Sequence, residues 1–530
     1  MKKFWDAREP FVWITASGLT LILLIAFLFL MIILLNGVGN FWPSPVIELT
    51  LKDESRVIGE HLQREKIPQK ENFQAQFKIG NRDIYGLDFR WIKEEEILSQ
   101  QYPEDIVVLE RQENGNFYGR LLEIQSSEKQ ESQDLNQQFS SILEQMEEKK
   151  AFRKQQNKEI SAISNQSEIL RLNILRLNYQ DAKKNKKTVE YLQEEREKLK
   201  KEFEDLLQKQ TAFVGKMKEH QATFIEANGK KKTIAFSDIV RFYRPNTMSF
   251  GSKILYYGTR LKELLWEDPR ESNTEGGLFP AIFGTVMMVM IMSCVSFPLG
   301  VIAAIYLKEY SKEGFAVQLV RIAVNNLAGI PSIVYGVFGL GFFVYSVGGT
   351  LDQLFFPERL PTPTFGTGGI LWASLTLSLL TVPVVIVATE EALNSVPKGM
   401  REASLALGAT KFQSLLRVVL PMASPGILTG FILAMARAAG EVAPLMITGV
   451  VKLAPSLPMD GKFPYLHLDQ KFMHLGFHIY DVGFQSPNVE AAKPMVFVTT
   501  LILVLVVLLM NSSAIYLRER MKKRYTLKAF

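Results

Sequence analysis

The sequence predicts an all-α polytopic membrane protein with six transmembrane helices and a large external insert, which combines a β-rich base with a helical coiled-coil hairpin. Two observations lead to this fold class. Residues 11–35 and most of residues 278–517 are rich in Leu, Ile, Val, Phe and Met, whereas the segment between them is rich in Lys, Glu, Gln and Asn. The mean hydropathy of +0.06 therefore averages a membrane body and a water-soluble segment.

The apolar runs are long enough to span a bilayer. The first run, residues 11–35, exceeds the roughly 7 to 15 apolar residues of a signal peptide and lacks a clear small-residue cleavage site, so we expect a retained helix. Five further runs approach the roughly 20 residues needed to cross a hydrocarbon core of about 30 Å. Their expected bounds are 279–307, 323–347, 368–389, 424–451 and 494–517.

Clusters of basic residues predict the orientation of these spans. Cytosolic flanks of membrane helices are enriched in Lys and Arg, and all the clusters here become cytosolic if both termini are inside. The chain then divides into residues 1–35 (cytosolic N-terminus and first span), 36–278 (external, periplasmic insert) and 279–530 (five-helix membrane core with a cytosolic loop, 390–421). The clusters are Lys2, Lys3 and Arg8; Lys308 and Lys312; Lys398, Arg401, Lys411 and Arg417; and Arg518, Arg520, Lys522, Lys523 and Arg524.

Two hairpin signals predict a β-rich base in the insert. Asn114-Gly115 and Asn228-Gly229 each lie between strand-like runs. Asn-Gly is a favoured two-residue turn between antiparallel strands, because both positions of that turn require positive φ.

The segment between these hairpins predicts a long helical arm. No glycine or proline occurs from Arg120 to Val214, and two out-of-phase heptad frames are separated by a Lys- and Asn-rich break at about 178–188. We therefore expect a coiled-coil arm over about 125–220 that reaches on the order of 60 Å from its base. The alternative is two separate amphipathic helices folded onto the base. The sequence gives no role or contact for the arm.

The loop from Glu390 to Pro421 holds the most specific motif of the chain. Glu402-Ala403-Ser404 is followed by Gly408, six residues after the glutamate, and then by Leu420-Pro421. This pattern resembles the EAA loop of ABC importer permeases, with Ser404 where that loop usually has Ala. The resemblance implies a helix, a glycine turn and a second helix that dock on an ATPase subunit. The coupling residues so implied are Glu402, Ala403, Ser404, Gly408, Leu420 and Pro421. The alternative is an ordinary amphipathic loop helix.

Three segments narrow the resemblance. Residues 267–285, 325–336 and 422–451 resemble the PstA-type permease subunit of the phosphate-specific ABC transport system. The likeness covers about 240–530 and leaves out the arm. It implies the type I ABC importer permease fold and phosphate as the cargo, in a multi-pass protein of the bacterial inner membrane with cytosolic N and C termini. The partners it implies are a second related permease, a cytosolic ATPase dimer and an external phosphate-binding protein.

Arg437 and Glu441 are the candidate substrate-pathway residues. Both fall inside the expected fifth span, where ionisable side chains are costly and point to function. Their i, i+4 spacing predicts that they lie on one helix face and pair when no substrate is present. A guanidinium group suits a phosphate oxyanion because its donors form a fixed fork. The alternative is a structural ion pair between packed helices.

Other features limit the function classes. No G-x-x-x-x-G-K-[ST] motif occurs, so we expect no enzyme activity in this chain; ATP and Mg²⁺ are used by the partner ATPase, and no cofactor is expected here. Cys294 is the only cysteine, and His467, His474 and His478 lack partners at ligand spacing, so no metal site is expected. A net charge of +6 is too small to indicate nucleic-acid binding.

Two alternatives stay open at the level of the sequence. The cargo is another oxyanion, such as sulfate, if selectivity resides in the binding protein rather than in this chain. The protein is a membrane sensor or scaffold if the external arm recruits partners and the helices serve only as an anchor. The motif at 402–421 favours the transporter, because an anchor does not need an ATPase-binding loop.

Overall fold

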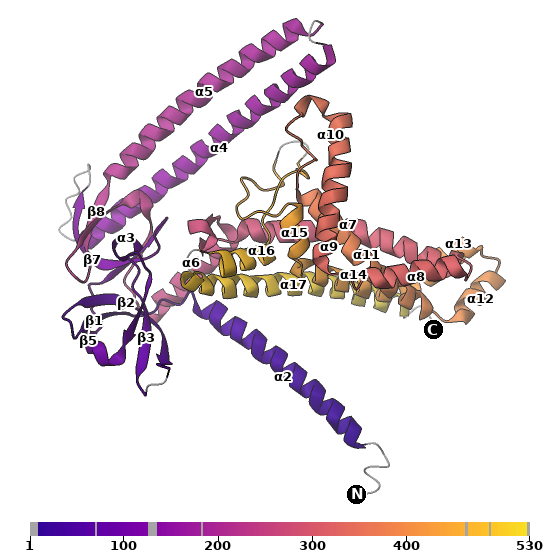
Figure 1. Ribbon diagram of the computed structural model, residues 1–530, viewed down its shortest axis with the longest axis horizontal. Coiled ribbons are helices and arrows are strands. Elements are labelled where there is room, and N and C mark those ends of the chain that lie inside the picture. Colours follow the sequence, from indigo (N-terminus) through magenta and orange to yellow (C-terminus); the bar gives the residue numbers. More distant parts are fainter. Residues whose placement is uncertain are drawn as a thin grey trace.

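The computed structural model describes residues 9–68, 71–125, 135–181, 184–461, 465–486 and 489–526. Lys2, Lys3 and Arg8 of the expected N-terminal basic cluster lie outside these residues. A helical bundle forms the membrane body, and a β-rich base stands at one end of it (Figure 1). Two long helices rise from the base and lean back over the bundle, and the N-terminal helix α2 diverges from it.

Six helices in the described part of the chain are long and apolar enough to cross a membrane, which confirms the expected number. The spans are Phe11–Gly39 in α2 (Glu9–Gly39), Phe279–Tyr310 beginning with α7 (Phe279–Ile305), Ser332–Phe355 from α9 (Ser332–Phe338) to α10 (Gly349–Phe355), Ile370–Asn394 (α11), Lys411–Gly440 from α13 (Lys411–Ser414) to α14 (Leu420–Gly440), and Val489–Lys523 in α17 (Val489–Thr526).

The third span begins later than the expected residue 323. A separate short helix, α8 (Phe315–Leu327), precedes it, and the spanning helix starts only at Ser332. The break falls at Gly329 and Pro331, and Pro331 has an extended backbone with ψ of 134°. Proline supplies no backbone N–H and its ring clashes with a preceding helical turn, so the helix cannot continue through it.

The fifth span is also displaced from the expected 424–451. It starts at Lys411, passes through a π-helical turn at Leu415–Val419 and ends at Gly440. Pro421 follows that turn, and a π turn is one way in which a helix accommodates a missing backbone donor. A further short helix, α15 (Ala443–Thr448), comes after the break.

Helix α11 lies at the centre of the bundle and packs on both α7 and α14. Small residues allow these helices to approach closely. A Cβ atom at Gly300 of α7 would lie 2.6 Å from the Val385 side chain, and one at Gly430 of α14 would lie 2.4 Å from Ala388. The bundle is therefore held by close backbone approach as well as by large apolar side chains.

The base contains two five-stranded antiparallel sheets, which confirms the expected β-rich insert. Both sheets have the same topology: four strands follow one another, and a fifth strand, reached through a 3-10 turn, pairs with the first. The first sheet consists of β1 (Val46–Leu51), β2 (Arg56–Lys66), β3 (Phe73–Lys78), β4 (Phe89–Lys93) and β5 (Ile97–Gln101). The second consists of β6 (Val107–Arg111), β7 (Phe117–Gln125), β8 (Gln221–Ile225), β9 (Lys231–Ala235) and β10 (Ile239–Tyr243).

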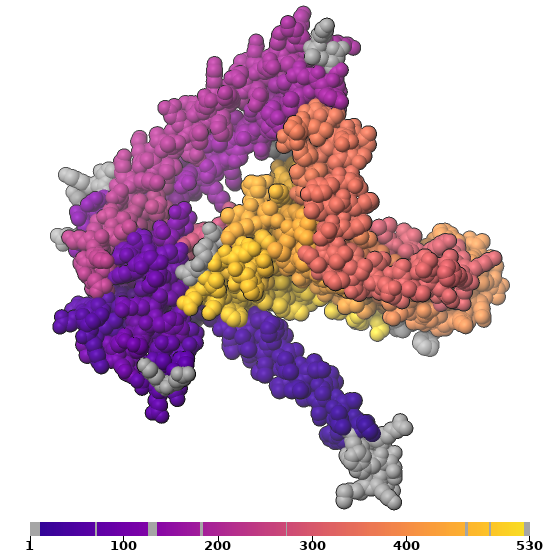
Figure 2. Space-filling model, in the orientation of Figure 1, coloured from indigo at the N-terminus to yellow at the C-terminus, as the bar shows by residue number. Residues whose placement is uncertain are grey.

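The arm interrupts the second sheet between β7 and β8. Its two helices, α4 (Leu135–Asp181) and α5 (Lys186–Glu219), pack against each other. Residues 126–134 and 182–183 of the expected arm lie outside the described residues. Far from the base, α4 contacts the Pro357–Arg359 turn that follows α10, so the arm forms an arch whose opening is visible in Figure 2.

Helix α6 and a short β ribbon join the base to the bundle, and two further short helices complete the fold. Helix α6 (Phe250–Trp266) follows the second sheet, and the two-stranded ribbon β11 (Pro269–Arg270) and β12 (Glu275–Gly276) leads into α7. Helix α16 (Leu475–Tyr480) precedes α17 and packs on it. The remaining helix of the base, α3 (Arg82–Tyr85), connects β3 to β4.

Candidate functional site

The loop with the Glu-Ala-Ser motif folds as a helix, a glycine turn and a second helix. Helix α12 (Lys398–Ala406) ends where Gly408 adopts a φ of 83°. The Ala409 N–H then donates to the Ser404 carbonyl over 3.2 Å, and the Leu407 N–H donates to the Ala403 carbonyl over 3.1 Å. Glycine is favoured at such a helix end because a side chain is costly at positive φ.

Side-chain contacts hold this loop to the end of the bundle opposite the base (Figure 1). The Arg401 guanidinium donates to the Leu393 carbonyl over 2.6 Å and lies 2.9 Å from the Glu309 carboxylate. The hydroxyl groups of Ser404 and Ser414 hydrogen-bond across the turn. A movement of the α12 helix would therefore be transmitted to the ends of α7 and α11.

The predicted coupling residues do not all lie together. Glu402, Ala403 and Gly408 are exposed and Ser404 is half-buried, all in the helix–turn segment. Leu420 and Pro421 are half-buried at the start of α14, where Leu420 packs among apolar side chains of the bundle. These two residues thus belong to the root of the fifth span rather than to the exposed turn.

Large apolar side chains are exposed around the turn, and motif reasoning missed them. Leu407 is 90% exposed and Phe412 is 60% exposed, and Met400 and Leu405 are also exposed. The sequence signal for this surface was the presence of apolar residues in a loop that is otherwise rich in Lys, Arg and Glu. Exposed apolar groups of this kind mark protein-contact surfaces.

Arg437 and Glu441 form an ion pair, but they do not share a continuous helix. The Arg437 Nε and Glu441 Oε1 atoms are 3.7 Å apart. Helix α14 ends at Gly440, and Glu441 has an extended backbone with φ of −79° and ψ of 132°. The expectation of one helix face was therefore wrong. The two side chains meet at a helix break, which leaves 35% of the arginine side chain and 22% of the glutamate side chain exposed.

The segment after the break packs on the third span. A Cβ atom at Gly336 of α9 would lie 2.7 Å from the Pro444 Cα atom of α15. This close contact fixes the segment that carries Glu441 against α9.

The three histidines that precede α17 have different surroundings. His474 and His478 are buried; the His474 Nδ1 atom accepts a hydrogen bond from the Gly476 N–H, and the His478 Nδ1 atom lies 3.2 Å from the Thr499 hydroxyl. His467 lies 3.0 Å from the Asp460 carboxylate. In the part of the chain that the structure describes, no group of three or more His, Cys, Asp or Glu side chains is arranged to hold a metal ion.

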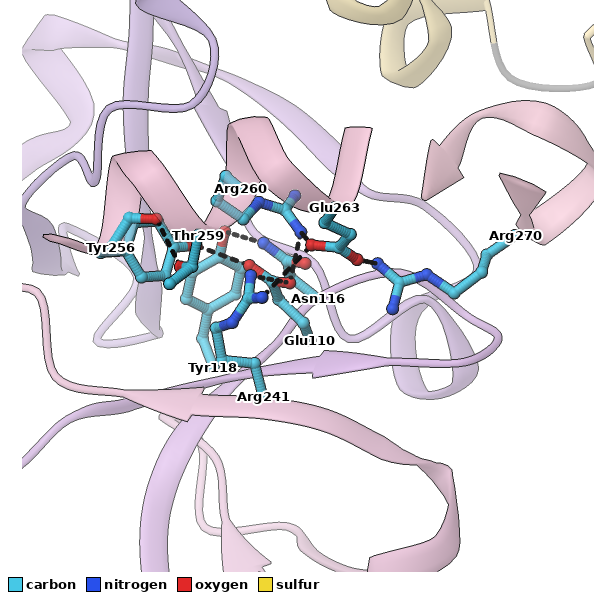
Figure 3. Close-up of polar contacts among 9 residues, drawn as sticks. All are labelled: Glu110, Asn116, Tyr118, Arg241, Tyr256, Thr259, Arg260, Glu263 and Arg270. Atoms are coloured by element: carbon cyan, nitrogen blue, oxygen red, sulfur yellow. Dashed lines mark hydrogen bonds and ion pairs between the residues drawn. The ribbon is translucent and has the colours of Figure 1, made fainter. Parts of the chain in front are cut away.

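A buried cluster of charged residues joins the base to α6, and it was not anticipated from the sequence (Figure 3). Glu110 of β6 lies 2.8 Å from Arg260 and 3.2 Å from Arg241, and its carboxylate accepts a 2.6 Å hydrogen bond from the Tyr256 hydroxyl. Glu263 of α6 binds the same two arginines and Arg270. Although burial raises the pKa of Glu110, the facing Arg260 and Arg241 groups hold it below its ordinary value.

Comparison with known proteins identifies the family. Residues 296–523 match the model of the family described as binding-protein-dependent transport system inner membrane component. The chain is 31% identical over 258 residues to a probable ABC transporter permease protein YqgI of Bacillus subtilis, covering 47% of this chain and 81% of that protein. It is 33% identical over 221 residues to a probable phosphate transport system permease protein PstA of Methanocaldococcus jannaschii, covering 41% of this chain and 67% of that protein.

Coverage varies among these comparisons. Against other permeases the chain spans less of their length, 61% of a second Bacillus subtilis permease and 51% of a Mycobacterium leprae one. Among solved structures, a bacterial ABC transporter involved in the import of the acidic polysaccharide alginate matches 49% of this chain and 83% of that one, with 16% identity and a TM-score of 0.36. The permease relatives named above are translocation components of transporters and not enzymes. The chain belongs to the family of binding-protein-dependent transport system inner membrane components, which are permease subunits of ABC transporters.

Proposed function

We propose that this permease is a translocation subunit of an ATP-driven phosphate importer in the bacterial inner membrane. It forms half of the pore together with a second related permease, and a cytosolic ATPase dimer and an external phosphate-binding protein complete the assembly. The relative from Methanocaldococcus jannaschii, which is named a phosphate transport permease, supports the choice of cargo. The observation that carries the proposal is the partly exposed guanidinium of Arg437 at a helix break inside the membrane body.

Arg437 suits the passage of an oxyanion for a physical reason. A phosphate ion that enters the bundle loses water, and an unpaired charge in the membrane costs several kcal/mol. A guanidinium group replaces part of that hydration with two parallel N–H donors. The 3.7 Å separation from Glu441 is long for a hydrogen-bonded pair, so the arginine can exchange its carboxylate partner for a phosphate.

The exposed turn between α12 and α13 supports coupling to an ATPase. Leu407 and Phe412 present apolar surface at the end of the bundle opposite the base, and Arg401 ties the turn to the spans. Lysines and arginines gather at this end, which supports its cytosolic placement and that of both termini. In this arrangement the partner ATPase uses ATP and Mg²⁺, and this chain holds no cofactor of its own.

Substitution of Arg437 tests the proposal. We expect Arg437→Gln to reduce uptake of radiolabelled phosphate by the assembled importer at least about tenfold, because the site loses its fixed charge. Arg437→Lys should restore only part of the uptake, since lysine lacks the planar fork. The matched control is Arg518→Gln, which removes an arginine from α17 outside the proposed path. Assembly of each variant is checked by co-purification with the ATPase.

The double substitution Arg437→Gln with Glu441→Gln separates a pathway role from a structural one. A structural ion pair can often be replaced by two neutral residues without loss. A pathway arginine predicts that uptake stays absent even though the doubly substituted complex assembles. Full phosphate uptake by that double variant would show that the pair is only structural.

A further inference from the structure

Helix α6 has its polar and apolar faces reversed relative to a helix of a soluble domain. Its buried side carries Glu263 and the half-buried Tyr256 and Arg260. Its exposed residues include only one charged side chain, Lys262. The large apolar side chains on the exposed side are Phe250 (71% exposed), Ile254 (52%), Leu255 (72%), Leu261 (37%), Leu265 (40%) and Trp266 (69%). Helices that face water show the opposite distribution.

The charged cluster of Figure 3 explains why the inner face is polar. Tyr256, Arg260 and Glu263 project from one side of α6 toward Glu110 of β6 and Arg241 of β10, and Arg270 reaches Glu263 from the ribbon before α7. These contacts fix the rotation of α6 about its own axis. The apolar residues on the other side are therefore held outward by the cluster rather than left there by a loose fit.

The outward face is continuous with the ends of two membrane spans. Trp42, which follows α2, lies 5.8 Å from the Phe250 ring and 6.3 Å from the Tyr257 ring. At the other end of α6, the Trp266 ring stacks on Phe279, the first residue of α7, at 6.0 Å. Leu264, on the inner side, packs into the apolar cluster at this end of the bundle. The helix thus lies where the spans emerge on the side of the base.

We propose that α6 is an interfacial helix whose outward face is immersed in the leaflet of the bilayer on the side of the base. Tryptophan, tyrosine and lysine beside apolar residues are typical of the boundary between lipid and water. Continuity with the apolar surfaces of α2 and α7 favours lipid over a separate protein as the occupant of this face. The cluster around Glu110 and Glu263 then holds the β-rich base at a fixed height and rotation on the membrane surface.

Collision accessibility of spin labels tests this placement. Single cysteines are introduced at Ile254 and Leu265 in the full chain with Cys294→Ser, labelled, and assembled with the partner subunits in lipid nanodiscs. The matched control is Leu207→Cys, where a leucine is also exposed (43%) but belongs to α5, the upper helix of the arm in Figure 1. We expect the ratio of oxygen to nickel-chelate accessibility to be at least about fivefold higher at positions 254 and 265 than at 207, because oxygen concentrates in lipid and the chelate stays in water.

Two other results would overturn the proposal. Nickel-chelate accessibility at Ile254 and Leu265 equal to that at Leu207 would place the face of α6 in water. Protection from both oxygen and the chelate, lost when the permease is reconstituted without its partners, would show that a protein subunit covers the face. Binding to the ATPase and the second permease is confirmed for each labelled variant, so that a misassembled complex is not read as a negative result.

Discussion

The backbone of Gly408 is the residue-scale feature on which the proposed coupling to an ATPase depends. Its φ of 83° lies in the left-handed region, where a residue with a side chain is strained by about 1 kcal/mol or more. A Cβ atom there would meet nothing within 4 Å, so the strain is purely that of the backbone. Gly399, nine residues earlier and inside α12, also has open space around it but no positive φ. Substitutions at these two glycines therefore differ in backbone conformation and not in steric crowding.

We expect Gly408→Ala to weaken association with the ATPase, because the turn between α12 and α13 must distort or pay about 1 kcal/mol of strain. Gly399→Ala should leave association unchanged, since alanine favours a helix interior. Co-purification of the ATPase with each membrane-inserted variant measures the effect. Equal association of the two variants would contradict a role for the glycine turn.

At the scale of elements, the insertion of the arm into the second sheet decides which residues of the arm can be deleted. Gln125 at the end of β7 pairs with Gln221 at the start of β8, so the two ends of the arm are adjacent. However, the first turns of the arm also complete the core of this sheet. Phe139, Ile142 and Met146 of α4 and Met217 of α5 are buried there, and the Phe139 ring lies 4.7 Å from Phe236. Among the described residues of the outer arm, 158–181 and 184–209, none belongs to this core.

Two deletions therefore differ in their expected effect. Removal of residues 158–209, with a short flexible linker from Asn157 to Gln210, should preserve the base, because these side chains already hydrogen-bond across the arm. Removal of residues 130–218 should destabilise the base by several kcal/mol, because it exposes the phenylalanine core. Limited proteolysis of the insert distinguishes the two variants. Equal protease resistance would show that the base does not need the root of the arm.

The sequence predicted long elements better than their ends. Six spans and the β-rich base follow from apolar length and Asn-Gly turns, and both are confirmed. Pro331 indicates that the third span starts later than residue 323. However, the apolar run continues through this proline, so the sequence pattern did not reveal the break. The repeated topology of the two sheets was not anticipated from the sequence. For α6, the alternation of Tyr256, Arg260 and Glu263 with apolar residues was visible, but its inverted burial depends on a cluster drawn from distant strands.

At the scale of the whole molecule, two buried histidines link stability to pH. Burial lowers the pKa of His474 to about 3 and that of His478 to about 4, both from an ordinary value of 6.5. Lys452 also opposes protonation of His478. Between these values and about 6.5 the unfolded chain binds protons that the folded chain does not. The stability contributed by the neutral imidazoles is therefore present above about pH 6.5 and is lost as the pH falls.

We expect His474→Asn to reduce the acid sensitivity of the folded protein. Asparagine keeps a side-chain acceptor for the Gly476 N–H but does not titrate. Between about pH 7.5 and pH 5.5 the wild type should lose about 1 kcal/mol more stability than the variant, by linkage for one histidine. Thermal unfolding of the purified permease at the two pH values gives the comparison. His61→Asn, on an exposed part of β2, is the control and should show the wild-type acid loss.

The contact between α4 and the Pro357–Arg359 turn sets the distance between the base and that turn. The Pro357–Arg359 turn meets α4 near Glu168, whose carboxyl has a pKa lowered first by Arg171 and further by Arg359. From the root at Phe139 to Glu168, a straight helix at 1.5 Å per residue spans about 44 Å. The base and the turn beyond α10 are thus joined twice, once through the chain at α6 and once by the arm, which acts as a strut. A rearrangement of the third span during transport must bend this strut, slide along it or part from it.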